Sequence, residues 1–228
     1  KLGELIDGKE TLNQDVIRPL DNPIYKEGSL AVLKGNLAPD GCVIKPAACD
    51  KKFLKHKGPA IVFDSYPDMK KIIDNDELDV TENHVLVLRN VGPVGGPGMP
   101  EWGMMPIPKK LLKKGVRDMV RISDARMSGT SYGACILHVA PESYVGGPLS
   151  LLETGDIVEI NVELRSINML VDEKTLLQRK KKVKKNNPKA GRGWLWMYSN
   201  HVRQANEGCD FDFLESDFGI SAKEPDIF

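Results

Sequence analysis

Short apolar runs broken by glycine and proline fill the chain from residue 29 onward, and they constrain its fold more than any other feature. The 228 residues include 21 glycines and 15 prolines. Eight runs are rich in Val, Ile and Leu and are bounded by turn residues, which is typical of strands. These predicted strands span residues 29–33, 42–45, 60–63, 84–89, 119–122, 134–139, 157–162 and 166–171.

Helical signals are fewer than strand signals. Met69, Ile72 and Ile73 follow Pro67 at helical spacing and predict a helix over 68–74. Further helices are predicted over 108–114, 172–183 and 198–207. Because strands outnumber helices without regular βαβ alternation, we expect a strand-rich, mixed β/α fold. A β-barrel or layered sheet with a few helices fits this pattern better than a doubly wound sheet.

Composition excludes several classes of function. Lys plus Arg and Asp plus Glu both total 32, so no net field attracts nucleic acid or an anionic membrane. No apolar run is long enough to cross a bilayer, and no signal peptide is visible. The basic tract 179–185 is interpreted as the solvated end of a helix. The first residue is Lys1 rather than Met, which indicates a start inside a longer protein.

The four cysteines stand alone at positions 42, 49, 135 and 209. None forms a C-x-x-C pair, so neither a zinc ribbon nor a thioredoxin-like redox motif is predicted. Four cysteines in a chain of this size do not make a disulfide scaffold. We therefore expect reduced thiols and a cytoplasmic protein.

The segment 92–101 holds four glycines and three prolines and ends in Glu101, its only ionisable residue. Such a segment cannot be a helix or a central strand. It lacks the G-K-[ST] sequence of a phosphate-binding loop. Two interpretations remain open, a rigid surface loop or a functional loop whose backbone approaches a ligand.

A second polar loop spans 123–131 and groups Asp124, Arg126, Ser128 and Thr130 around Gly129. A serine in such a turn either stabilises the loop or is activated as a nucleophile or base. His138, in a predicted strand, is interpreted as structural rather than as a ligand. Because no metal-ligand cluster or complete acid/base pair is visible, the chain resembles half of a site.

Seven segments together resemble the IlvD/Edd family of dihydroxy-acid and sugar-acid dehydratases. The matching residues are 18–20, 35–41, 92–101, 123–130, 138–142, 146–148 and 155–157. The sequences GNLAPDG, GGPGMPE and SDARMSG occurring together are highly specific, and the likeness extends from about Thr11 to the end of the chain.

The resemblance implies that this chain is part of a larger enzyme. Residues 1–28 would be a lead-in from a missing N-terminal domain, and 29–228 a swivelling β-barrel-like β/β/α domain. The missing domain would carry the ligands of an iron–sulfur cluster, expected to be 2Fe-2S, and further magnesium ligands. A homo-oligomer, dimer or tetramer, is also expected, with no nucleic-acid or membrane partner.

The resemblance also implies roles for four residues. Glu101 would complete a Mg²⁺ shell, a role suited to a carboxylate oxygen. Ser128 would act as an alkoxide base, while Gly129 and Thr130 would help to bind the substrate. The expected reaction is dehydration of a 2,3-dihydroxy acid to a 2-keto-3-deoxy acid.

Three functions remain as alternatives. The sequence Ala125-Arg126-Met127, the run 131–133 and the tail 192–214 favour the sugar-acid branch, with an aldonic acid such as arabinonate, xylonate or galactonate as substrate. The first alternative is dihydroxy-acid dehydratase of branched-chain amino-acid synthesis. The second is a non-catalytic binding module with the same fold.

Overall fold

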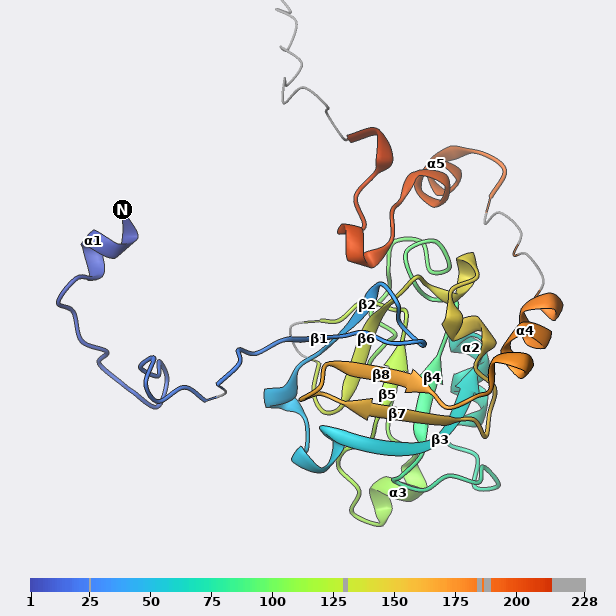
Figure 1. Ribbon diagram of the computed structural model, residues 1–228, viewed down its shortest axis with the longest axis horizontal. Coiled ribbons are helices and arrows are strands. Elements are labelled where there is room, and N and C mark those ends of the chain that lie inside the picture. Colours follow the sequence, from blue (N-terminus) through green and yellow to red (C-terminus); the bar gives the residue numbers. More distant parts are fainter. Residues whose placement is uncertain (25, 129–130, 184–185, 187–189, 215–228) are drawn as a thin grey trace, which may run out of the picture.

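One curved sheet organises the protein. The computed structural model describes residues 1–24, 26–128, 131–183, 186 and 190–214. Within them, eight strands pair in the order β1-β2-β6-β5-β4-β3-β7-β8 (Figure 1). The strands are β1 Ala31–Leu33, β2 Gly41–Ile44, β3 Lys55–Phe63, β4 Val85–Leu88, β5 Arg121–Ser123, β6 Cys135–Ala140, β7 Ile157–Asn161 and β8 Ser166–Met169.

The two ends of this sheet meet just beyond β1. Lys34 forms a parallel bridge with Ser166 at the start of β8. The Lys34 amide donates to the Arg165 carbonyl at 2.9 Å, and the Ile167 amide donates to the Lys34 carbonyl at 3.1 Å. The sheet is therefore nearly closed, and the predicted strand-rich, barrel-like fold is confirmed.

The middle of the sheet is parallel and its flanks are antiparallel. Strands β3, β4, β5 and β6 run in the same direction, whereas β1–β2, β2–β6, β3–β7 and β7–β8 are antiparallel pairs. Every residue of β4 (VLVL) is buried, as expected for a strand covered on both faces. Strand β7 instead shows the alternating burial of a strand with one solvated face.

Each predicted strand corresponds to an observed one, but β3 begins five residues earlier than predicted. Gly58 and Pro59 interrupt the apolar pattern, so the sequence indicated a start at Ala60. In the structure Gly58 and Pro59 pair with Val158 and Ile157 of β7. A Cβ atom on Gly58 would lie 2.0 Å from the Asn83 carbonyl oxygen, so the glycine permits a close approach of two backbones.

The helices are short and peripheral. Ser65 caps α2 by accepting from the Asp68 amide, and Asp172 caps α4 by accepting from the Thr175 amide. In Figure 1, α3 and α5 lie at opposite ends of the barrel. The α-helices are α1 Leu2–Ile6, α2 Tyr66–Ile72, α3 Lys109–Lys113, α4 Glu173–Lys182 and α5 Gly193–His201. The 3₁₀ turns are η1 Pro46–Ala48, η2 Lys51–Phe53, η3 Ser143–Val145, η4 Pro148–Leu151, η5 Ala205–Glu207 and η6 Asp212–Leu214.

The helix predicted over 198–207 is wrong in its bounds. Helix α5 ends at His201, because Val202 leaves the helix and bridges Phe211 in an antiparallel pair. Beyond it, only the 3₁₀ turn η5 forms before Gly208, which has a φ of 83°. Tertiary pairing therefore overrides the local helical preference here.

The basic tract ends α4. Arg179 pairs with Asp156 and Glu153, which attaches the helix to the barrel. Lys180, Lys181 and Lys182 are exposed in the last helical turn, where cations interact favourably with the helix dipole. The rest of the tract, at 184–185, lies outside the described residues.

Closure of the barrel depends on a close contact at Gly35. A Cβ atom there would lie 1.9 Å from the Ile167 carbonyl oxygen. We expect Gly35→Ala to lower the free energy of unfolding by about 1–3 kcal/mol, because the β8 backbone must move. Urea denaturation measures the change. Gly3→Ala is the matched control, since nothing lies within 4 Å of a Cβ atom at Gly3; equal stability of the two variants would contradict this account.

Candidate functional site

The three predicted motifs follow three neighbouring parallel strands. The segment 92–101 follows β4, the segment 124–130 follows β5, and the segment 141–148 follows β6. The sheet order places β4, β5 and β6 side by side. Because carboxyl ends of parallel strands meet at one edge, all three loops leave the barrel from the same edge. Topology therefore brings together residues that are distant in the sequence, such as Asn90 and Ser143, which are 53 residues apart.

Asp124 joins these three loops from a fully buried position. Its carboxylate accepts hydrogen bonds from the backbone amides of Asn90 (3.2 Å) and Val91 (3.0 Å), which follow β4. It also accepts from the amide of Ser143 (2.9 Å) and from the Ser143 hydroxyl, which follow β6. Burial raises the pKa of Asp124, and these hydrogen bonds act in the opposite direction.

Glu142 supports the glycine-rich loop in the same way. Its buried carboxylate accepts from the amides of Val94 (2.8 Å) and Gly95 (2.9 Å) and from the Gln204 side-chain nitrogen (2.9 Å). A Cβ atom on Gly92 would lie 2.6 Å from this carboxylate, so only glycine permits the approach. Burial raises the pKa of Glu142, and its hydrogen bonds oppose that effect. The loop at 92–95 therefore rests on a buried carboxylate.

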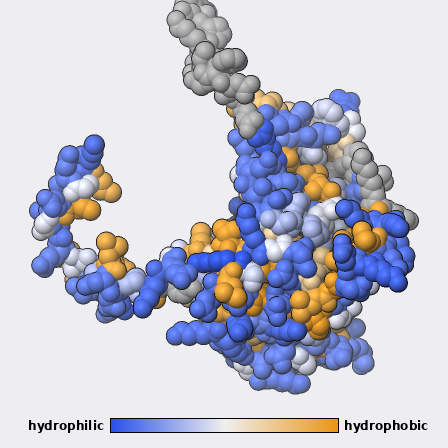
Figure 2. Space-filling model, in the orientation of Figure 1, coloured by the Kyte–Doolittle hydropathy of each residue, from blue (hydrophilic) through white to orange (hydrophobic). Residues whose placement is uncertain are grey.

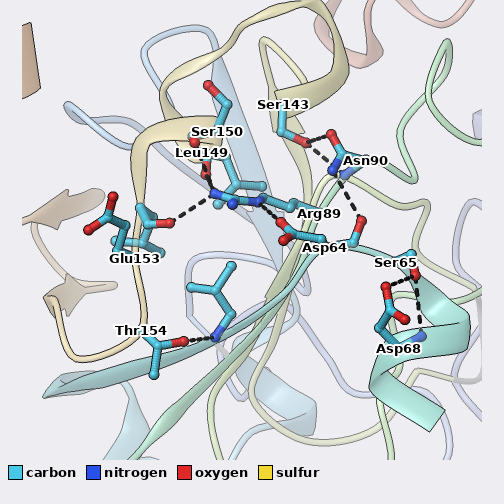
Figure 3. Close-up of polar contacts among 12 residues, drawn as sticks. Asp64, Ser65, Asp68, Arg89, Asn90, Ser143, Leu149, Ser150, Glu153 and Thr154 are labelled. Atoms are coloured by element: carbon cyan, nitrogen blue, oxygen red, sulfur yellow. Dashed lines mark hydrogen bonds and ion pairs between the residues drawn. The ribbon is translucent and has the colours of Figure 1, made fainter. Parts of the chain in front are cut away.

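Arg89 and Asn90 attach the end of β4 to its neighbours (Figure 3). The Arg89 Nε atom donates to Asp64 at 2.6 Å, and its Nη1 atom donates to the carbonyls of Ser150 and Leu152, both at 2.9 Å. Asn90 donates from its side chain to the Asp64 carbonyl at 3.1 Å. These contacts anchor the base of the glycine-rich loop.

Glu101 and Arg126 connect the two predicted loops directly. The Arg126 Nη2 atom lies 2.5 Å from the Glu101 Oε1 atom, and both side chains are about half exposed, at 46% and 47%. The sequence did not predict this ion pair. It brings the position expected to bind a metal to within two residues of Ser128 along the second loop.

Ser128 is half-buried, and the loop that carries it runs back alongside β6. Its amide donates to the Ser131 hydroxyl at 3.2 Å, and its carbonyl accepts from the Lys45 Nζ atom at 2.6 Å. The preceding amide, of Met127, donates to the His138 Nε2 atom at 2.8 Å. Gly129 and Thr130, the predicted substrate-binding residues, lie outside the described residues.

His138 occupies a bulge in β6. Gly41 of β2 pairs with Ala140 and Val43 with Leu137, so β6 has one extra residue there, and His138 has a φ of 57°. The bulge lets its amide donate to the Ala125 carbonyl while its ring accepts from Met127. Burial, together with the nearby Arg126 charge, lowers the pKa of His138, which favours this acceptor role.

The described residues fit a magnesium ion only in part. A carboxylate oxygen suits Mg²⁺, and Glu101 is accessible enough to supply one. No group of three or more His, Cys, Asp or Glu side chains that could hold a metal occurs among the described residues. Among the described residues, Glu101 is therefore a possible single ligand and does not by itself make a metal site.

The cysteines do not fit an iron–sulfur cluster. A cluster needs several cysteines gathered at one place, but no group of three or more metal-ligating side chains occurs among the described residues. Burial raises the pKa of Cys135 and Cys209, and all four thiols are free. The four described cysteines therefore do not form an iron–sulfur site with one another.

A cavity of about 490 Å³ lies on the β3 side of the glycine-rich loop. Tyr66 and Trp102 stack there with their ring centroids 4.8 Å apart. Neither Glu101 nor Ser128 lines it, although Pro100 and Trp102, the neighbours of Glu101 in the sequence, do. Its lining residues are Asp64, Ser65, Tyr66, Pro67, Asn90, Val91, Gly95, Gly96, Pro97, Pro100, Trp102, Tyr144 and Asn186.

Hydrophilic residues cover much of the face seen in Figure 2, with hydrophobic patches between them. Among the described residues, no helix has the length and apolar character needed to cross a membrane.

Comparison with known proteins identifies one family. Residues 15–209 match the family model described as dihydroxy-acid/6-phosphogluconate dehydratase C-terminal. The chain is 51% identical over 218 residues to 6-deoxy-6-sulfo-D-gluconate dehydratase of Pseudomonas putida, covering 94% of this chain and 37% of the relative. It is 45% identical to L-arabinonate dehydratase of Rhizobium leguminosarum, covering 89% of this chain and 35% of the relative.

A relative named for the other substrate class also matches. Dihydroxy-acid dehydratase of Clostridium beijerinckii is 42% identical, covering 92% of this chain and 37% of the relative. The chain thus spans little more than a third of the length of these curated relatives.

The support of the glycine-rich loop by Glu142 can be tested by Glu142→Gln. An amide has one acceptor oxygen, so one of the three donors would face an NH₂ group. We expect the free energy of unfolding to fall by about 1–3 kcal/mol. Chemical denaturation measures this loss, with the exposed Glu163→Gln as control. A loss no larger than the control's would show that the carboxylate does not support the loop.

The lowered pKa of His138 predicts a pH dependence of stability. The unfolded histidine, with its usual pKa of about 6.5, binds a proton before the folded one does, so the free energy of unfolding decreases as the pH falls below about 6.5. His138→Gln keeps an acceptor but does not titrate, and we expect a weaker decrease between about pH 7 and 5. Denaturation of both proteins across this range measures the difference.

The burial of His56 also lowers its pKa, but it contributes equally to both proteins and cancels in the comparison. Identical pH dependence of the two proteins would show that His138 is not the titrating group.

Proposed function

The chain belongs to the IlvD/Edd dehydratase family, and we propose that it forms the C-terminal part of a hydro-lyase that dehydrates a sugar acid to a 2-keto-3-deoxy acid. The observation that supports this proposal is the contact between the loop at 92–101 and the loop at 123–131. Glu101 from one loop pairs with Arg126 of the other at 2.5 Å, only two residues from Ser128. This arrangement supports one reaction centre with a metal ligand and a base on adjacent loops.

In this proposal Ser128 removes the proton from C2 of the substrate. The electron pair of the broken C2–H bond, stabilised by the neighbouring carboxylate, forms the C2=C3 double bond as the C3–O bond breaks. The 3-hydroxyl group leaves as hydroxide and takes up the proton that the Ser128 alkoxide had accepted, which gives water and restores the alkoxide. The resulting enol then tautomerises to the 2-keto-3-deoxy acid. Mg²⁺ bound through Glu101 and outside ligands would stabilise the negative charge that develops on the substrate.

In this proposal three side chains, those of Arg126, Asp124 and Glu142, fix the conformation of the site. Arg126 orients Glu101, while Asp124 and Glu142 hold the two loop backbones through buried hydrogen bonds. Because these donors and acceptors are already in place, little reorganisation accompanies the reaction. Gly129 and Thr130 are proposed to contact the substrate.

The remaining parts of the enzyme are proposed to come from outside this chain. They are an N-terminal domain that supplies a 2Fe-2S cluster and the other magnesium ligands, and a second copy in a homo-oligomer. Residues 1–28 would lead in from that domain, and 29–228 would be the swivelling domain. No described residue before position 29 is buried, and Figure 1 shows this segment extending away from the barrel. A cytoplasmic location is also proposed, supported by the four free thiols.

The sugar-acid substrate is supported by the Ala125-Arg126-Met127 sequence and by the relatives named for sulfogluconate and arabinonate. Relatives named dihydroxy-acid dehydratase match at 39–42% identity, so that activity is the second candidate. A panel of pentonates, hexonates and 2,3-dihydroxyisovalerate distinguishes them when 2-keto acid formation is followed anaerobically with Mg²⁺. Turnover of dihydroxyisovalerate alone would overturn the sugar-acid assignment.

Ser128→Ala in the full-length protein tests the role of the base. We expect kcat to fall by about 10²–10⁴-fold, because the group that accepts the C2 proton is removed. Iron and magnesium contents should equal those of the unmodified protein. Turnover on the preferred acid, together with metal analysis, measures both results.

The exposed Ser29→Ala serves as the matched control and should retain full activity. Glu101→Gln provides a second arm, in which the Mg²⁺ concentration for half-maximal binding should rise, as measured by calorimetry. Full activity of Ser128→Ala would remove this serine from the mechanism. If no acid is turned over with metals bound, the non-catalytic binding module becomes the better account.

A further inference from the structure

A lysine from another strand contacts the residue proposed as the base. Lys45 directly follows β2, and its half-buried side chain reaches the loop after β5. Its Nζ atom lies 2.6 Å from the Ser128 carbonyl oxygen. A hydrogen bond from an ammonium group is shorter and about twice as strong as one between neutral groups. Lys45 therefore makes a specific contact with Ser128 rather than a diffuse electrostatic one.

Two other contacts restrain the same short stretch of backbone. The Met127 amide donates to His138 on β6, and the Ser128 amide donates to Ser131 within the loop. The peptide groups on both sides of the Ser128 Cα atom thus have side-chain partners. Of the three side chains that contact this backbone, Lys45 is the one that carries a charge and the one that follows β2. Together these contacts restrict rotation of the backbone that carries the Ser128 hydroxyl.

We propose that Lys45 is a positioning residue for the dehydration reaction, holding the Ser128 carbonyl so that the hydroxyl keeps one orientation toward the substrate. This inference rests on the proposed function of Ser128. Lys45 acts through the Ser128 backbone and does not itself touch the reacting atoms in this account. Its importance follows from geometry, since a base must lie within hydrogen-bond reach of the proton that it removes.

The topology explains why a lysine at this position reaches Ser128. Strands β5 and β6 are parallel, so the loop between them must return along the barrel to the start of β6. Strand β2 is antiparallel to β6, and Ile44 pairs with Ile136 near that start. Lys45 therefore lies beside the returning loop, although 83 residues separate it from Ser128.

Kinetics of full-length variants test the proposal. We expect Lys45→Met to lower kcat by about 10–100-fold, the effect of misplacing a reacting group by roughly 1 Å. KM should stay within about threefold, because the substrate still binds. Lys45→Arg keeps a cationic donor and should recover most of the lost kcat. Lys57→Met, an exposed lysine on β3, is the matched control and should leave both constants unchanged.

Hydrogen exchange provides a readout that does not depend on activity. In Lys45→Met the amides of Met127 and Ser128 should exchange about tenfold faster, while amides in β4 keep their protection. Hydrogen exchange tests whether Lys45 holds the Ser128 backbone even if none of the acids is turned over. Absence of turnover would contradict the proposed function and leave the contact of Lys45 to be judged from the exchange rates. Unchanged exchange at these amides would overturn the proposal.

The kinetic arm has two further overturning results. One is unchanged kcat in Lys45→Met while the unmodified enzyme turns over its substrate. The other is loss of activity together with lost protection throughout the barrel and no recovery in Lys45→Arg, which would assign Lys45 a general structural role.

Discussion

Parallel pairing of β3, β4, β5 and β6 is the constraint on which the rest of the structure depends. Strands buried on both faces must be apolar along their length, as the sequence VLVL of β4 shows. Strand β5 holds the buried polar residues Arg121 and Ser123, but the polar residues of the candidate site gather in the loops that follow the strands. Because the strands are parallel, these loops leave from one edge. The same pairing thus determines both the hydrophobic core and the place where chemistry is possible.

Buried carboxylates then fix the conformation of the loops that lie together at this edge. Asp124 accepts hydrogen bonds from segments after β4 and β6, and Glu142 accepts from the glycine-rich loop. Removing a carboxylate from water is unfavourable unless its oxygens find donors, and backbone amides supply them here. Each loop also has amides that need acceptors once water is excluded. The two requirements satisfy each other, so the irregular loops have a specified conformation.

The candidate site is accordingly rigid at its base and more accessible at its tip. Asp124 and Glu142 are fully buried, whereas Glu101 and Arg126 are about half exposed. An accessible carboxylate such as that of Glu101 can still bind a cation. Such a division suits a domain that contributes only some of the groups of a shared centre.

The sequence by itself determined the strand-rich fold class, the approximate position of every strand and the family. These follow from the spacing of apolar residues, from the turn residues and from the order of the motifs, all of which can be read along the chain. The sequence predicted Glu101 and Ser128 through the family resemblance, and their roles remain predictions. Only the tertiary structure decided the parallel pairing, the early start of β3 and the end of α5 at His201. It also decided the contacts of Lys45, His138, Asp124 and Glu142. The physical reason is that these depend on strand direction and on hydrogen bonds between residues distant in sequence, which no local pattern encodes.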